Sequence, residues 1–292
     1  MHTMRRSGNH FFAGISLLIW VLLSGANSIG RADGSQEVLG QVLEAFTMRQ
    51  QIPTLLPDLD AKVAIEIQDL LLMNLAPDYG VVAGYLFETT AGDWTVLAPL
   101  LENMFTSSGA TLYEAKGSEQ SVNLGWLLRV RGGAGGVVSG APSTRGFFSE
   151  LIPAVFVHDQ LLREEQRNHW AAMTAVNAGT RYLVLGTPWP IPERGDPEIL
   201  NGPLKAVLVN GTGEILTEGV RSSGDQERLE SLSQLQHLLA ARGRTLRAGD
   251  LVSLGSVGPA VVTGGIGRVT ARFSTVLGDS AIVFAIRPPI SD

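Results

Sequence analysis

The pattern of apolar and polar positions changes about a third of the way along the chain. Apolar residues recur at helical spacing over residues 36–49 and 59–75, which predicts two amphipathic helices. Asp60 is the predicted N-cap of the second helix, and Pro77 is expected to end it. Residues 81–89 are predicted to be extended, and the apolar run 96–104 is predicted to form a short helix. The first part of the chain is therefore expected to be mainly helical.

Beyond residue 112 the pattern favours strands. Strands are predicted over 121–130, 152–158, 182–185, 251–254, 268–274 and 280–286, and the Asn210-Gly211 pair predicts a hairpin joining 205–209 to 214–219. Helices are predicted over 171–180 and 226–242, the latter followed at 255–258 by a small-residue loop whose amides could face a ligand. This order predicts an α+β fold with a curled mixed sheet. Its expected parts are a helical lobe over 33–112 and a β-rich domain over 113–292.

Two segments are predicted to be loops. Residues 131–139 are rich in glycine, but they lack the spacing of a phosphate-binding loop. Residues 187–203 carry five prolines and are expected to form an ordered loop or a lid.

The amino-terminal segment has the layout of a secretory signal peptide. Arg5 and Arg6 precede an apolar run over residues 11–23, and small residues follow up to Ala32. Cleavage is expected after residue 32, so the mature protein would start near Asp33 in the periplasm or outside the cell. The alternative is an uncleaved membrane anchor, although the apolar run is short for a spanning helix.

Composition narrows the function classes. The 292 residues are 45% hydrophobic, the net charge is −6, and Lys and Arg are scattered, so no nucleic-acid partner is predicted. The chain has no cysteine, which excludes disulfides and a thiol nucleophile.

Several motifs together resemble one family. They are LAARG at 239–243, LRAGD at 246–250, LGS at 254–256, NAGTRYLVLG at 177–186, the hairpin over 208–219, Gly84-Tyr85 followed by Thr89, and 100–104 followed by Ser108-Gly109-Ala110. In this order they are similar to the 2-keto-4-pentenoate hydratases and 4-oxalocrotonate decarboxylases, which have the fumarylacetoacetate hydrolase-like fold. The resemblance covers about residues 36–288 and implies a pseudo-barrel of curled sheet with a helical amino-terminal lobe. It also implies oligomeric relatives that use Mg²⁺ or Mn²⁺, held by carboxylates, to act on 2-oxo acids.

The chain departs from the family where the chemistry should lie. The resemblance places two metal ligands at Asn123 and Gly125, or in a shifted register at Ser121 and Asn123, and a third at Phe156. The family's catalytic lysine falls on Leu86. No register restores a carboxylate, and a hard divalent ion needs several oxygen ligands. We therefore predict no metal and no other cofactor.

Other residues are candidates for new roles. Glu88 and His158 could serve as surrogate acid or base, or they could be a solvated rim residue and a structural hydrogen-bonding residue. The predicted pocket residues are Leu86, Asn123, Gly125, Phe156, Asn177, Gly255 and Ser256. Asn123 and Asn177 could bind a small carboxylate or carbonyl compound, or they could be satisfied core amides.

The resulting prediction is an exported hydratase-like protein that has lost the metal-dependent chemistry and binds a small ligand or a protein partner. The alternative is an active hydratase or decarboxylase with a rearranged, metal-independent site. A third hypothesis is a structural subunit, which would assemble as a homo-oligomer or with another protein.

Overall fold

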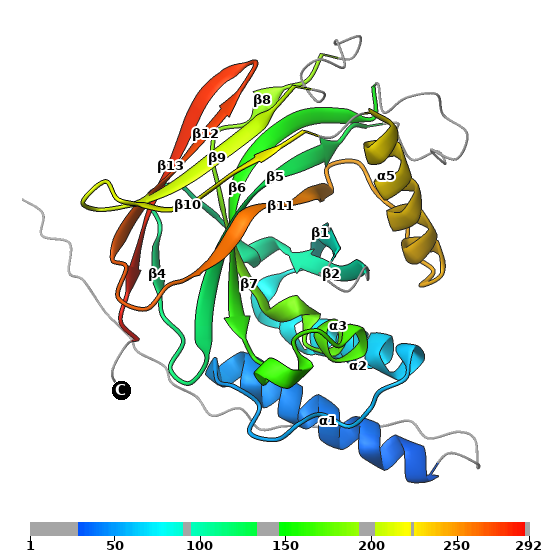
Figure 1. Ribbon diagram of the computed structural model, residues 1–292. Coiled ribbons are helices and arrows are strands. Elements are labelled where there is room, and N and C mark those ends of the chain that lie inside the picture. The colour runs from blue at the N-terminus through cyan, green and yellow to red at the C-terminus, as the bar shows by residue number, and fades with distance from the viewer. Residues whose placement is uncertain (1–28, 90–94, 133–145, 193–201, 223–224, 290–292) are drawn as a thin grey trace, which may run out of the picture.

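The computed structural model describes residues 29–89, 95–132, 146–192, 202–222 and 225–289 (Figure 1). The predicted signal segment before residue 29 lies outside this part, as do residues 133–139 of the glycine-rich loop and 193–201 of the proline-rich segment. Within the described residues, no helix is both long enough and apolar enough to cross a membrane.

The described α-helices are α1 (Ile29–Met48), α2 (Ala61–Tyr79), α3 (Trp170–Ala175) and α5 (Asp225–Ala240). Asp60 caps α2 as predicted, because its carboxylate accepts a hydrogen bond of 2.9 Å from the Val63 amide. Pro77 does not end α2 where predicted, and the helix runs two residues further to Tyr79. The start of α1 at Ile29 puts the predicted cleavage point, before Asp33, inside that helix.

The strands form two mixed sheets. Their bounds are β1 (Val82–Thr89), β2 (Thr95–Leu101), β3 (Phe105–Ser107), β4 (Thr111–Tyr113), β5 (Glu119–Val130), β6 (Phe148–Gln160), β7 (Thr180–Leu185), β8 (Trp189–Pro190), β9 (Leu204–Asn210), β10 (Ile215–Arg221), β11 (Leu251–Val262), β12 (Arg268–Thr275) and β13 (Gly278–Arg287). The eight-stranded sheet has the order β2-β1-β11-β5-β6-β7-β3, with β8 paired to β6, and the five-stranded sheet has the order β10-β9-β12-β13-β4. The α+β architecture with curled mixed sheets is confirmed, although neither sheet closes into a barrel among the described strands.

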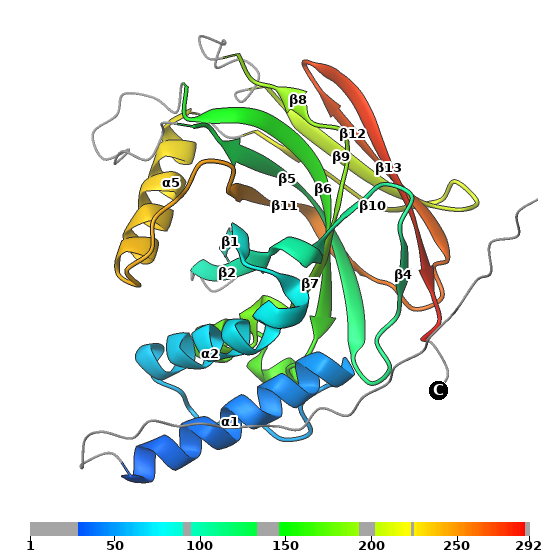
Figure 2. The same cartoon turned by 180° about the vertical axis from the view of Figure 1, so that it is seen from behind.

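The eight-stranded sheet separates two hydrophobic cores. On β5, Trp126 and Leu128 face the core shared with the five-stranded sheet and α5, while Leu127 faces the core covered by α1, α2 and α3. Figures 1 and 2 show the same division, with α5 standing apart from the other three helices. We call these the inter-sheet core and the helix-side core.

Three further local predictions were wrong, and one was confirmed. The run 96–104 forms β2 and a 3₁₀ turn at Glu102–Met104, because a continuous apolar run suits a buried strand as well as a helix. The 171–180 segment contains only α3 and a 3₁₀ turn at Asn177–Gly179 before β7 begins. The predicted hairpin is present: β9 pairs with β10, residues 211–214 lie between them, and the Asn210 side chain accepts hydrogen bonds from the Thr212 and Glu214 amides. The predicted loop at 255–258 lies inside β11, where bulges absorb extra residues.

A contact between two glycines joins the sheets. A β-carbon on Gly219 of β10 would lie 2.5 Å from the Gly258 nitrogen of β11, so the two backbones touch. Gly258 has a φ of +76°, which glycine adopts without strain. The Thr217 hydroxyl donates a 3.0 Å hydrogen bond to the Pro259 carbonyl beside this contact. The junction fixes the end of β10, and therefore Arg221, against β11.

Candidate functional site

The positions that the resemblance assigns to a metal site come together, but a phenyl ring occupies the space between them. Pairing of β5 with β6 sets Asn123 opposite Phe156 and Gly125 opposite Ala154. A β-carbon on Gly125 would lie 2.4 Å from Cε2 and 2.8 Å from Cζ of Phe156, so the ring lies directly over the glycine. Phe156 and Leu86 are 0% and 1% exposed within the helix-side core.

This arrangement does not fit Mg²⁺ or Mn²⁺. Such ions need several oxygen ligands, and neither the phenyl ring nor the leucine supplies one. Asn123 offers one amide, whose nitrogen donates to the Ser256 hydroxyl at 3.2 Å. Among the described residues, no group of three or more His, Cys, Asp or Glu side chains is placed to hold a metal ion.

Asn177 lies in a buried polar network, away from any described cavity. Its amide nitrogen donates to the Pro99 carbonyl at 3.1 Å, and its oxygen accepts from the Gln68 amide at 3.0 Å. Gln68 in turn accepts a 2.7 Å hydrogen bond from Arg242. Burial lowers the pKa of the Arg242 guanidinium, and the nearby charge of Asp69 opposes this only in part. Gln68 therefore links α2, β2, the turn at Asn177 and the segment after α5.

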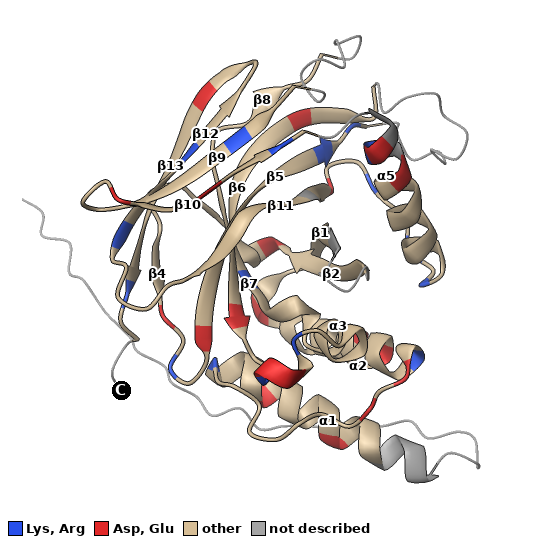
Figure 3. Ribbon diagram, in the orientation of Figure 1, with Lys and Arg blue, Asp and Glu red and all other residues tan. Residues whose placement is uncertain are grey.

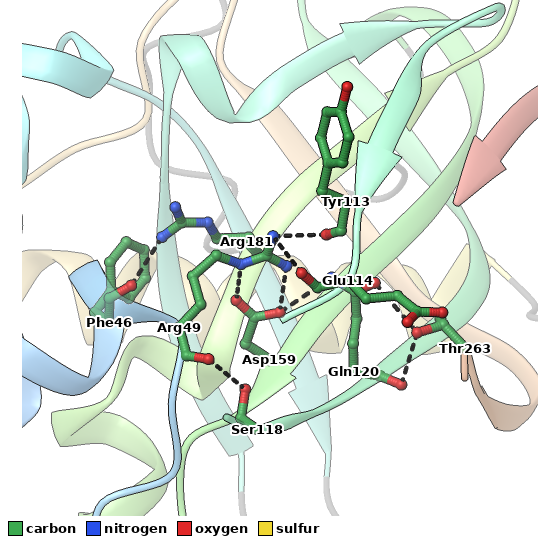
Figure 4. A network of polar contacts seen from close by, with 9 residues as sticks. All are labelled: Phe46, Arg49, Tyr113, Glu114, Ser118, Gln120, Asp159, Arg181 and Thr263. Carbon is green, nitrogen blue, oxygen red and sulfur yellow. Dashed lines mark hydrogen bonds and ion pairs between the residues drawn. The ribbon is translucent and has the colours of Figure 1, made fainter. Parts of the chain in front are cut away.

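His158 and Asp159 sit at the end of β6 in a structural setting. Nδ1 of His158 lies 3.2 Å from the Ala178 carbonyl oxygen. Asp159 accepts two hydrogen bonds from Arg49, at 2.8 and 2.9 Å, and one from Gln120 at 3.1 Å (Figure 4). Burial alone would lower the pKa of Arg49, but the hydrogen bond and charge of Asp159 prevail and raise it. The Glu88 side chain lies outside the described part of the chain.

A cavity of about 370 Å³ lies between α5 and the inter-sheet face of the eight-stranded sheet. Phe87, Leu128 and Val252 form its floor, on the strand faces that point away from Leu86. Of the predicted pocket residues, Gly255 and Ser256 line it. The cavity is therefore distinct from the space that Phe156 fills.

A bulge in β11 shapes one wall of this cavity. Ser253 pairs with Leu127 and Ser256 with Gly125, so β11 carries one extra residue there, and Gly255 takes a φ of +84°. The Ser253 hydroxyl holds the bulge to β1: it accepts from the Phe87 and Gly255 amides at 3.2 and 3.1 Å and donates to the Phe87 carbonyl at 3.2 Å. Gly255 and Ser256, at the bulge, form part of the cavity wall.

The charged residues of the cavity wall were not among the predicted site residues. Arg221 reaches it from β10, while Glu227 and Arg228 reach it from the first turns of α5. Figure 3 shows charges of both signs meeting near this end of α5. One feature of the sequence could have indicated that Arg228 is buried. It precedes Leu232 and Leu235 by four and seven residues, so it occupies the apolar face of the helix. Arg221 had no such signal, because its neighbours come from distant segments.

The cavity wall combines charged and hydroxyl-bearing residues. Its described lining contains two arginines and one glutamate, and the other polar residues there are Ser231, Ser253 and Ser256. Guanidinium groups remain protonated and pair with carboxylates through two parallel hydrogen bonds. The described lining contains no histidine, cysteine or lysine that could act as base or nucleophile. A small anion is the ligand class that matches this wall.

Comparison with solved structures identifies the fold. The chain is similar to 4-oxalocrotonate decarboxylase from Pseudomonas putida G7 complexed with calcium and acetate, with a TM-score of 0.69 and 15% identity over 87% of this chain and 98% of that one. The magnesium and adipate complex of that enzyme matches with a TM-score of 0.67 and 16% identity over 88% and 98%. A yeast protein of the fumarylacetoacetate hydrolase family matches with a TM-score of 0.50 and 9% identity over 72% and 96%.

The protein therefore has a fumarylacetoacetate hydrolase-like fold, as the sequence motifs predicted. No protein-family model matches the sequence, and no curated protein matches it. At identities of 9–16%, the likeness extends to the fold and not to the reaction.

Proposed function

We propose that this protein is an exported, hydratase-like binding protein that no longer carries out metal-dependent chemistry on 2-oxo acids. The observation that carries the proposal is the Phe156 ring lying over Gly125, 2.4 Å from where a β-carbon would be. The paired strands β5 and β6 are present at this point, while Phe156 and Leu86 offer no ligand to a cation.

The positions that would hold a divalent ion lack several oxygen ligands at once. A divalent ion gives up hydration water only when protein oxygens replace it. A single amide cannot compensate for the loss of charge and ligands, and burying an incompletely coordinated ion is costly. We therefore expect no specific affinity for Mg²⁺ or Mn²⁺ at Asn123, Gly125 and Phe156.

Titration calorimetry with Mn²⁺ tests this proposal. The full chain should give no saturable heat, while the Pseudomonas putida decarboxylase, whose structures hold calcium or magnesium, serves as the positive control. Saturable binding in the micromolar range would contradict the proposal.

An activity assay separates binding from metal-independent catalysis. Purified protein is incubated with 2-hydroxypentadienoate and a panel of 2-oxo acids, with and without chelator, and no turnover is expected. Chelator-resistant turnover that disappears in Glu88→Gln or His158→Gln would instead establish a rearranged active site.

Export is checked separately, by amino-terminal sequencing of protein recovered from the periplasm or medium, where a mature start near residue 33 is expected.

A further inference from the structure

We propose that the cavity beneath α5 binds a small monocarboxylate with an apolar body. This inference deepens the proposed binding function, but it depends on different residues from those that argue against a metal. It rests on the placement of two arginines, on a glycine that makes room for one of them, and on an apolar floor.

Arg221 is placed to donate to an anion. Its Nε–H is buried and has no hydrogen-bond partner among the described residues. The guanidinium has one described ion-pair partner, Glu227, at 3.7 Å, and that carboxylate is 57% exposed. Leaving a buried charged donor without an acceptor is costly, so a carboxylate that accepts from Nε–H would stabilise this arrangement.

Gly255 makes room for the Arg221 guanidinium. A β-carbon at this position would lie 2.7 Å from NH1 of Arg221. The junction of Gly219 with Gly258 holds the end of β10 against β11, so the arginine head lies over the bulge next to Ser256. Arg221, Gly255 and Ser256 therefore line the same part of the wall.

Arg228 supplies a second guanidinium from α5. Its side chain lines the cavity and the residue is 4% exposed, so its charge is held away from bulk solvent. Electrostatic attraction is stronger there than at the protein surface, since water screens it less. Glu227 is 57% exposed, so solvent screens its charge more than that of Arg228.

The remaining lining selects the body of the ligand. Phe87, Phe148 and Leu128 present apolar surface opposite the charged wall. A cavity of about 370 Å³ lies at the small end of the range for ligand sites. A carboxylate attached to a short aliphatic or aromatic body matches both features, whereas a highly charged phosphate compound would leave the apolar floor without a partner.

Hexanoate is a suitable probe, with hexan-1-ol as its neutral analogue. Titrations of the full chain are run in the presence of EDTA, so that the result does not depend on any metal. We expect saturable binding of hexanoate and binding of hexan-1-ol at least about tenfold weaker, because the alcohol lacks the charge. Arg221→Gln should weaken hexanoate binding by about tenfold or more.

Two further variants keep the test decisive. Arg272→Gln removes an equivalent charge from the exposed face of β12 and should change affinity less than about twofold. Ser231→Trp fills the cavity from α5 and should abolish hexanoate binding without removing a charge, with circular dichroism confirming that each variant is folded.

The proposal is overturned if hexanoate does not bind up to roughly 10 mM, if hexan-1-ol binds equally well, or if Arg221→Gln and Ser231→Trp bind like the unmodified protein. Mn²⁺ binding in the separate titration would contradict the loss of the metal site and leave these outcomes unaffected.

Discussion

At the residue scale, the phenyl ring at Phe156 can lie where it does only because position 125 has no side chain. Replacing Gly125 with alanine places a methyl group 2.4 Å from the Phe156 ring, and we expect a loss of about 1–3 kcal/mol in the free energy of unfolding. Phe156→Leu removes the colliding ring atoms, so the alanine should cost at least about 1 kcal/mol less in the double variant. Chemical denaturation of the four proteins measures this coupling.

Gly40→Ala provides the matched control for that cycle. Gly40 lies on the exposed face of α1, and a β-carbon there would meet no heavy atom within 4 Å, so alanine should raise stability by about 0.5–1 kcal/mol. Additive effects of Gly125→Ala and Phe156→Leu would show that the ring does not fill the space over the glycine.

Asp250 is expected to make stability depend on pH. Burial raises the pKa of this carboxyl above its ordinary value of 3.8, and the hydrogen bond from the Arg247 amide opposes the shift only in part. A raised folded-state pKa gives stability that is present below 3.8 and lost as pH rises through the folded-state value.

Asp250→Asn removes this titration and keeps an oxygen that can accept from the Arg247 amide. The difference in unfolding free energy, variant minus unmodified protein, should therefore increase from below pH 3.8 towards neutrality. The lost ion pair with Arg247 matters little, because that arginine is 59% exposed. Urea denaturation across this range is the measurement, and a difference that falls with pH would contradict the expectation.

Residue positions at the expected metal site were predictable, but side-chain directions were not. The sequence identified Asn123, Gly125 and Phe156 as neighbours, because a strand register can be carried over from a motif. It could not show that the ring covers the glycine, since the side-chain direction depends on packing against Leu86 and the helices. Asn177 was predicted to line the ligand pocket because of its place in a motif. In the structure its side chain is hydrogen-bonded to Pro99 and Gln68.

At the scale of elements, Gln68 joins α2 to β2, to the turn at Asn177 and to the segment after α5. Gln68→Leu leaves the Leu97 carbonyl, the Asn177 amide oxygen and Arg242 without their hydrogen bonds from this side chain. Each unsatisfied buried group costs about 1–3 kcal/mol, so we expect a loss of roughly 3 kcal/mol or more.

Gln234→Leu is the comparison, because exposed Gln234 makes a single described hydrogen bond, to Thr95. Its effect should remain within about 0.5 kcal/mol in thermal or chemical denaturation. Equal losses in the two variants would mean that the buried network does not hold α2 to the strands.

Helices and strands were predicted most reliably where the spacing of apolar residues continued over many residues. The helices over 36–49, 59–75 and 226–242 and most strands appear close to their predicted places. The run 96–104 was ambiguous because residues buried on both faces show no period. The 255–258 segment was misread because its glycines suggested a loop, whereas they permit bulges within a strand.

At the scale of the whole molecule, one sheet carries both cores, so the two cores should unfold together. Leu71→Ala opens a void in the helix-side core, and we expect it to destabilise the protein by about 2–5 kcal/mol. Far-ultraviolet circular dichroism and tryptophan fluorescence should shift to the same new midpoint.

A second transition that keeps its original midpoint would contradict this expectation, and would favour separate folding of the predicted 33–112 and 113–292 regions. Leu208→Ala, in the inter-sheet core, is the reciprocal variant and should move both probes equally. The domain boundary at residue 112 stays a prediction until this is measured, although β1 and β2 pair within the same sheet as β5 and β6.

The overall fold was predictable because its motifs retain their order along the chain, even at 15% identity to the decarboxylase. The cavity was not, because Arg221, Gly255 and Arg228 meet only after the β10–β11 junction and α5 are in place. Long-range packing of this kind leaves no local pattern in a single sequence.

The ring of Phe156 also has a consequence for single substitutions. A glutamate introduced at 125 alone would collide with that ring, and a glutamate at 156 alone would be an isolated carboxylate in an apolar interior. Each single substitution is therefore expected to be destabilising, and neither would complete a cation site on its own. Under the proposed function, several simultaneous substitutions would be needed for this position to bind a cation.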